Sequence, residues 1–134
     1  MGRALHELSI EMKAKSIELL ARACELGIPV MIIQTGRTME EHQANLARGV
    51  SWIKLSKHLS RSIRGIHMDM INMDKADAID ICPYETFSLH GPDKLEWDVT
   101  DPIWFKLGLL GESLGLRWGG RWEQKDMGHF ELPF

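Results

Sequence analysis

The C-terminal run from Trp118 to Glu131 concentrates groups that can do chemistry. It combines acidic side chains, a histidine, two tryptophans and three glycines within fourteen residues. Asp126 and His129 are separated by two residues, and a bend at Gly128 would place both side chains on the same side of a cleft. An imidazole that binds a metal, beside a carboxylate that accepts a proton from water, is typical of a catalytic zinc site. A turn followed by an edge strand gives the same spacing, so the remaining ligands must come from upstream.

A carboxylate candidate lies in a short apolar segment. Residues 76–82 alternate small or apolar residues with aspartates and are followed by Pro83, which predicts a short strand. Asp80 stands between two isoleucines, and a carboxylate in such surroundings is costly to bury unless it is paired or bound to a metal. This reasoning favours Asp80 over Asp74 and Asp77 as a ligand.

His58 completes a set of three ligands. It follows Ser56 and Lys57, and together with Asp80 and His129 it would leave one zinc position open. Nitrogen and oxygen ligands without a thiolate fit catalytic rather than structural zinc, and Asp126 would then act as the base.

Arg37 is a candidate for binding a negatively charged group. It ends the run Gln34-Thr-Gly-Arg37, directly after a predicted buried strand. Its planar guanidinium offers paired donors to an oxyanion or a carboxylate. A solvated surface arginine would fit the same pattern.

The elements that must position these residues indicate an α+β fold, with a small antiparallel sheet and flanking helices in one domain, residues 1–134. Hydrophobic periodicity and helix-cap residues predict three helices, at 4–26, 38–48 and 102–114. Apolar β-prone runs predict strands at 28–34, 76–82, 116–118 and 129–132, with the last two paired.

The first helix and the two cysteines carry further expectations. We expect the helix to bury the face that carries Ile17, Leu20, Ala21 and Cys24. Cys24 and Cys82 are interpreted as small buried hydrophobic residues in a reducing compartment rather than as ligands or nucleophiles.

Residues 59–75 have no clean periodicity and are interpreted as a long irregular loop. Such loops are usually functional or mobile, so the segment is either one wall of a binding cleft or a disordered surface insertion.

Composition narrows the classes of function. The chain has 134 residues and a net charge of −3, which argues against a general nucleic-acid binder. Neither a signal peptide nor a segment long enough for stable membrane insertion is recognised, so we expect a cytoplasmic location.

Five pieces of the sequence together resemble a known family: Gln34-Thr-Gly-Arg37, Ser56-Lys-His58, Ala78-Ile-Asp80-Ile, Leu116-Arg-Trp-Gly-Gly120 with Trp122, and Asp126-Met-Gly-His129-Phe-Glu131. The chain is similar to the zinc D-Ala-D-Ala carboxypeptidases of the VanY type and to the phage L-alanyl-D-glutamate endopeptidases, which cut peptidoglycan stem peptides.

The resemblance implies a role for each matching residue. His58, Asp80 and His129 would ligate Zn²⁺, Asp126 would be the catalytic acid and base, and Arg37 would bind substrate or stabilise the oxyanion. The other matching side chains would line the substrate cleft or support the ligands, with Glu131 accepting the second ring proton of a ligand histidine. These supporting candidates are Gln34, Ser56, Trp118, Trp122 and Glu131, although core packing is expected of at least one tryptophan.

One departure from the family pattern concerns the first histidine. His58 and Asp80 are 22 positions apart, whereas the family usually places these two ligands much closer together. His67 lies within the implied insertion and nearer to Asp80, and His90 is a third candidate, but the Ser-x-His signature favours His58.

The resulting hypothesis is a monomeric phage or prophage endolysin that acts as an L-alanyl-D-glutamate endopeptidase. We expect it to stay in the host cytoplasm until a membrane lesion releases it to the periplasm or cell wall. Three alternatives remain: a D-Ala-D-Ala carboxypeptidase, a zinc hydrolase acting on another small amide or dipeptide, and a non-catalytic cell-wall-binding module on the same fold.

Overall fold

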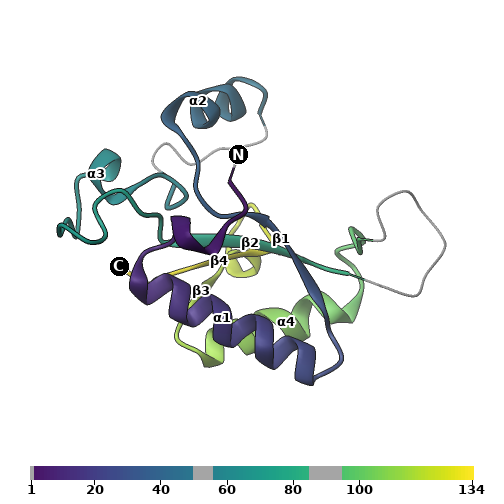
Figure 1. The fold of residues 1–134 in the computed structure, drawn as a ribbon. Coiled ribbons are helices and arrows are strands. Elements are labelled where there is room, and N and C mark those ends of the chain that lie inside the picture. Colours follow the sequence, from purple (N-terminus) through teal and green to yellow (C-terminus); the bar gives the residue numbers. More distant parts are fainter. Residues whose placement is uncertain (1, 50–55, 85–94) are drawn as a thin grey trace.

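A four-stranded antiparallel sheet forms the centre of the molecule (Figure 1). The computed structural model describes residues 2–49, 56–84 and 95–134. The strands follow the order β1-β2-β4-β3. Their bounds are β1 (Val30–Gln34), β2 (Ala78–Pro83), β3 (Arg117–Trp118) and β4 (His129–Glu131). The helices are α1 (Ile10–Glu25), α2 (Met39–Ala47), α3 (Arg61–Arg64) and α4 (Pro102–Ser113), with 3₁₀ turns η1 (Leu5–Glu7) and η2 (Gly119–Arg121).

Helices α1 and α4 lie side by side against one face of the sheet, and α2 and α3 lie away from that layer (Figure 1). The core fills the space between the two long helices and the sheet, and buries Met12, Leu19, Leu107, Ile79 and Phe130 among others. The α+β prediction is confirmed, as is the antiparallel pairing of β3 with β4.

Local capping signals correctly placed two helix starts. The Thr38 side chain accepts the Glu41 N–H and the Glu41 carboxylate accepts the Thr38 N–H, which completes the predicted capping box of α2. Asp101 caps α4, with Pro102 in its first turn.

The prediction of one helix from residue 4 was wrong at its start. The Ser9 side chain accepts the Met12 N–H and begins α1 at Ile10, so residues 5–7 form a separate 3₁₀ turn. Ser9 also donates its hydroxyl proton to Asp77, which anchors this break to the start of β2.

The predicted buried face of α1 was also wrong. The helix buries Met12, Ser16, Leu19 and Ala23, whereas Ile17 is 50% exposed and Ala21 and Cys24 are exposed. Leu20 packs partly against the core. The buried Ser16 made the true face look less apolar than its neighbour. Cys82 is buried, as predicted.

The strands separate the core from the polar groups by simple alternation. Ile79 and Ile81 join the core, so Asp80 between them points to the opposite face. Asp80 pairs in register with His129 on one side and with Gln34 on the other. The sheet therefore lines up a carboxylate, an imidazole and an amide on the face away from α1 and α4.

Residues 59–75 are held to the body of the protein by two buried arginines, which the sequence had not singled out. Arg61 and Arg64 both donate to Asp77, whose side chain is fully buried. The side chain of Ser60 caps α3 inside this segment. Asp77 is thus more deeply buried than Asp80, contrary to the expectation that Asp80 was the interior carboxylate.

In the described ranges, no helix is both long and apolar enough to cross a membrane.

Candidate metal centre

His58, Asp80 and His129 meet on the polar face of the sheet. A ligand atom of each lies within 4.8 Å of the others. Both histidines are 2% exposed, and their rings meet edge to face with centroids 5.1 Å apart. The structure thus brings together the three side chains that the sequence grouped.

His58 is fixed by its backbone and by one ring nitrogen. Its N–H donates to Ser56 Oγ at 3.2 Å and its carbonyl accepts the Arg37 N–H at 2.9 Å. Nδ1 lies 2.7 Å from the carbonyl oxygen of Thr35. A carbonyl can only accept, so Nδ1 carries the proton and Nε2 is left with a lone pair. Nε2 lies 3.1 Å from Oδ1 of Asp80.

His129 is fixed in the same way by a carboxylate. Its Nε2 donates to Oε1 of Glu131 at 2.8 Å, which leaves Nδ1 3.0 Å from Oδ1 of Asp80. Lys57 Nζ lies 2.9 Å from the other oxygen of Glu131. Burial alone would raise the pKa of Glu131, but its bonds to His129 and Lys57 lower it, so this carboxylate stays ionised.

The donor set fits a zinc ion. In their neutral forms, two imidazoles would direct lone pairs at one carboxylate oxygen, and these groups repel unless a cation lies between them. Nε2 of His58 is buried and makes no hydrogen bond of suitable geometry with any described residue. Two nitrogens and one carboxylate oxygen, with the second nitrogen of each imidazole already bonded, match the ligands and supports of catalytic zinc sites.

Without a metal, protonation of His129 supplies positive charge beside Asp80. Burial opposes the charged form of His129, but hydrogen bonds to Asp80 and Glu131 raise its pKa to about 10. Burial would likewise raise the pKa of Asp80, yet the adjacent His58 and His129 hold it far below its ordinary value. The ionised Asp80 carboxylate therefore favours a positive charge at this position.

Asp126 lies beside the three ligands and is more accessible than they are. Its Oδ2 is 3.9 Å from Nδ1 of His129, and its side chain is 39% exposed. Burial, followed by repulsion from Asp80, raises its pKa above that of an ordinary aspartate. Gly119 permits this approach, because a Cβ there would lie 2.5 Å from the Asp126 carbonyl oxygen and 3.1 Å from the His129 Cβ.

Arg37 is held by two side chains that leave its charge directed at the site. It donates to Gln34 Oε1 at 2.6 Å and to His42 Nδ1 at 2.9 Å. Burial lowers its pKa, while attraction to Asp80 and Asp126 works in the opposite direction. His42 is fully buried on α2, and no spacing in the sequence had marked it as a support for this arginine.

The two tryptophans have different surroundings. The Trp122 ring centroid lies 4.9 Å from that of His129, and the side chain is half-buried. Trp118 is in the core and donates its indole N–H to the Met127 carbonyl at 2.8 Å. Trp122 therefore borders the site, whereas Trp118 supports the loop that carries Asp126.

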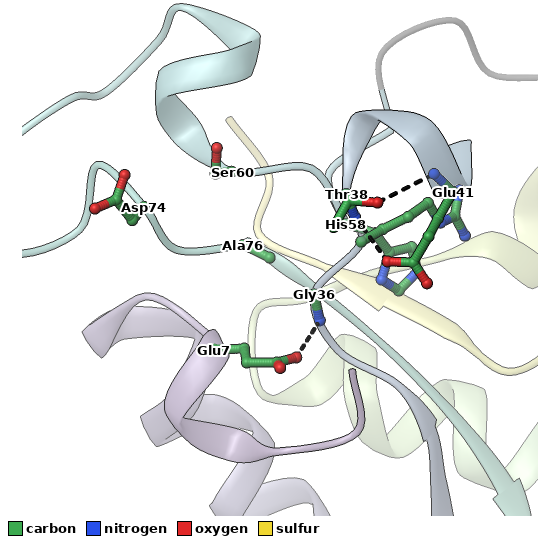
Figure 2. A pocket seen from close by; sticks show the side chains of 9 residues that line it. Glu7, Gly36, Thr38, Glu41, His58, Ser60, Asp74 and Ala76 are labelled. Atoms are coloured by element: carbon green, nitrogen blue, oxygen red, sulfur yellow. Dashed lines mark hydrogen bonds between the residues drawn. The ribbon is translucent and has the colours of Figure 1, made fainter. Parts of the chain in front are cut away.

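A pocket of ≈ 230 Å³ adjoins the ligand cluster on the side of His58 (Figure 2). Its lining includes Glu7, Arg37, His58, Ser60 and Asp74. The last two belong to the segment 59–75, which therefore forms part of the wall of this pocket. That the segment lines a binding cleft stays a prediction.

One alternative histidine, His67, is not part of this cluster. His67 is exposed and packs on Phe134, with ring centroids 4.0 Å apart. His90 lies outside the described residues.

Comparisons with known proteins agree with this architecture. A family model described as D-alanyl-D-alanine carboxypeptidase matches residues 75–132. This match includes Asp80, Asp126 and His129. The fold is similar to that of the L-Ala D-Glu endopeptidase ChiX of Serratia marcescens, with a TM-score of 0.67 and 18% identity over 97% of this chain and 84% of that one. No curated protein matches the chain. The resemblance to these two groups of peptidases is confirmed.

Proposed function

We propose that the chain is a zinc metallopeptidase that hydrolyses peptidoglycan stem peptides, as an L-alanyl-D-glutamate endopeptidase of phage or prophage origin. The observation that carries the proposal is the His58, Asp80 and His129 cluster. Both imidazoles have one nitrogen bonded to a fixed acceptor and turn the other toward the same carboxylate oxygen. A divalent cation bound there would offset the charge of the Asp80 carboxylate and would coordinate the free nitrogen of each imidazole.

His58, Asp80 and His129 would hold the zinc ion. Bound there, zinc would polarise the scissile carbonyl and lower the pKa of water to about 7. The chain's own residues supply the remaining chemistry, and the single domain of residues 1–134 would act as a monomer.

Asp126 would accept the proton of the attacking water and return it to the leaving amine. Its raised pKa suits both transfers, because a carboxylate whose pKa lies nearer neutral pH accepts a proton from water more readily and can still return it to the leaving amine. Partial exposure beside His129 leaves room for water and substrate at its oxygens.

Arg37 would bind the negative charge that develops on the carbonyl oxygen. Gln34 and His42 orient its guanidinium before substrate arrives, so little reorganisation accompanies the reaction. Trp122 would cover His129 and shield this side of the site from water.

A D-Ala-D-Ala carboxypeptidase is the second candidate, and the family description of residues 75–132 favours it. The two activities leave different products. The endopeptidase creates a new N-terminal D-Glu, whereas the carboxypeptidase releases a terminal D-Ala.

The test is to digest purified muropeptides with the zinc-loaded chain and to identify the products by mass spectrometry. We expect about one zinc per chain by elemental analysis. We also expect Asp126→Ala to lower the activity by about 10²- to 10⁴-fold while the metal is retained. Glu123→Ala, which removes an exposed carboxylate from the same loop, is the matched control. A native protein that binds no zinc, or an Asp126→Ala variant as active as this control, would refute the proposal.

A further inference from the structure

A carboxylate near the N-terminus lies directly behind the peptide bond that holds His58. Oε1 of Glu7, in η1, accepts the Thr35 hydroxyl at 2.7 Å and the Gly36 N–H at 3.0 Å. The bond from Glu7 to Gly36 is visible in Figure 2. The Gly36 N–H and the Thr35 carbonyl belong to the same peptide unit. That carbonyl accepts the Nδ1 proton of His58.

We propose that Glu7 is a positioning residue for the metal centre, acting on His58 through the peptide bond between Thr35 and Gly36. This inference depends on the proposed zinc site. It assigns a role to a residue 51 positions before His58, outside every motif that the sequence brought forward.

The geometry gives Glu7 two effects on His58. The Thr35 hydroxyl holds Oε1 of Glu7 in place, and the bond from the Gly36 N–H to that oxygen then fixes the peptide plane. The plane fixes the direction in which the carbonyl meets the imidazole. A negative charge at the N–H end of a peptide also polarises its carbonyl oxygen, which becomes a stronger acceptor. A stronger acceptor at Nδ1 makes Nε2 a better electron donor to a metal.

Backbone hydrogen bonds hold Glu7 and the turn at Thr35 and Gly36 in place. The backbone of Gly2 bonds to both sides of the same turn, with Thr35 N–H donating to the Gly2 carbonyl and Gly2 N–H to the Gly36 carbonyl. Residue 36 must be small, because a Cβ there would lie 2.9 Å from Oε1 of Glu7 and 3.3 Å from its Cβ. The Glu7 carbonyl accepts the Ala76 N–H, which ties η1 to the segment leading into β2.

The two candidate imidazole ligands then have comparable supports. His129 bonds directly to the carboxylate of Glu131, whereas His58 reaches the carboxylate of Glu7 through one peptide unit. Each ring would be oriented and made more basic by an anion on the side away from the metal.

The experiment measures zinc affinity by competition with a chromophoric chelator, together with thermal unfolding of the metal-free proteins. Glu7→Ala should weaken zinc binding about 10- to 100-fold, the range typical of supporting residues. Glu7→Gln keeps an acceptor oxygen of the same size but removes the charge. It should unfold within a few degrees of wild type while binding zinc about tenfold more weakly. Glu40→Gln, which removes an exposed charge from the first turn of α2, should bind as wild type does.

The outcomes separate the inference from the proposed function. If wild type fails to bind zinc, the proposed function fails, and the positioning role fails with it. If wild type binds zinc and Glu7→Gln binds equally well, the charge of Glu7 has no effect on His58 and only this inference is overturned. If zinc affinity falls in Glu7→Gln but not in Glu40→Gln, the inference stands.

Discussion

Asp77 and Asp80 lie three residues apart at the start of β2, and their surroundings differ in one decisive respect. Asp77 is fully buried and accepts hydrogen bonds from Ser9, Arg61 and Arg64. Asp80 instead faces nitrogens of His58 and His129. Arginine is always charged, whereas a neutral imidazole offers a lone pair.

The difference separates a structural carboxylate, Asp77, from the proposed metal ligand, Asp80. Asp77 is neutralised by cations that belong to the chain, so its charge is satisfied as soon as the protein folds. Asp80 instead faces the protonated His129, whose Nδ1 proton a metal ion can replace. Burial alone does not make this distinction, since Asp77 is the more deeply buried of the two.

Removing the charge of Asp80 should have the largest effect on metal binding. We expect Asp80→Asn to weaken zinc affinity by more than the roughly 10- to 100-fold typical of outer-shell changes, because a direct ligand and its charge are lost. Chelator competition measures this affinity. Zinc binding as tight as that of wild type would contradict the role of Asp80 as a metal ligand.

Asp77→Ala should have the largest effect on stability. It removes the buried carboxylate that Arg61 and Arg64 share, although Arg61 keeps its contacts with the exposed Glu11 and Asp69, and breaking a buried ion pair costs about 3–5 kcal/mol. Denaturant unfolding of the metal-free protein measures the loss.

Asp69→Ala removes an exposed carboxylate 3.5 Å from the same Arg61 and is the matched control. Its side chain also accepts the Ile71 and Asn72 N–H groups, so we expect a small loss of stability, well below that of Asp77→Ala. Equal midpoints for the two variants would contradict a structural role for Asp77.

The contribution of Asp77 to the free energy of unfolding should decrease in acid. Burial would raise the pKa of Asp77, but the bonds from Arg61, Ser9 and Arg64 lower it below its ordinary value. The stabilisation is therefore complete above the unfolded pKa of about 3.9 and is lost as pH falls through the lower folded pKa. Metal-free wild type and Asp77→Asn should differ most in unfolding free energy above about pH 4, and the difference should shrink in stronger acid. A difference in unfolding free energy that grows as the pH falls would contradict this prediction.

Lys57→Met should have the smallest effect of the four. Lys57 donates to the Leu132 carbonyl at 2.6 Å and pairs with Glu131, so its loss weakens the carboxylate that orients His129. Zinc affinity should fall by less than about tenfold, because the change is one contact further from the ligand. Lys106→Met, on the exposed side of α4, is the control. A loss as large as that of Asp80→Asn would indicate that Lys57 acts more directly.

Local signals accounted for much of what the sequence predicted correctly. Thr38 with Glu41, and Asp101 with Pro102, begin helices through contacts within a few residues. The grouping of His58, Asp80 and His129 came from residue chemistry together with family motifs, and the structure places them together.

Long-range contacts explain what the sequence did not reveal. The salt bridges of Arg61 and Arg64 with Asp77 join residues that only the folded chain brings together. The buried Ser16 disguised the inner face of α1, because a polar residue there makes this face look less apolar than its neighbour. The supports of the site, including His42 and Glu7, are ordinary polar residues in sequence and acquire their roles through the partners they meet.

The pairing of Asp80 with His129 across β2 and β4 ties the candidate centre to the register of the sheet. A one-residue slip of β2 would turn this carboxylate toward the hydrocarbon layer and bring an isoleucine out in its place. A misregistered pairing would thus bury the Asp80 carboxylate in the core and would also disrupt the candidate metal site. If zinc is present while the chain folds, its binding would stabilise the native strand register over the shifted ones.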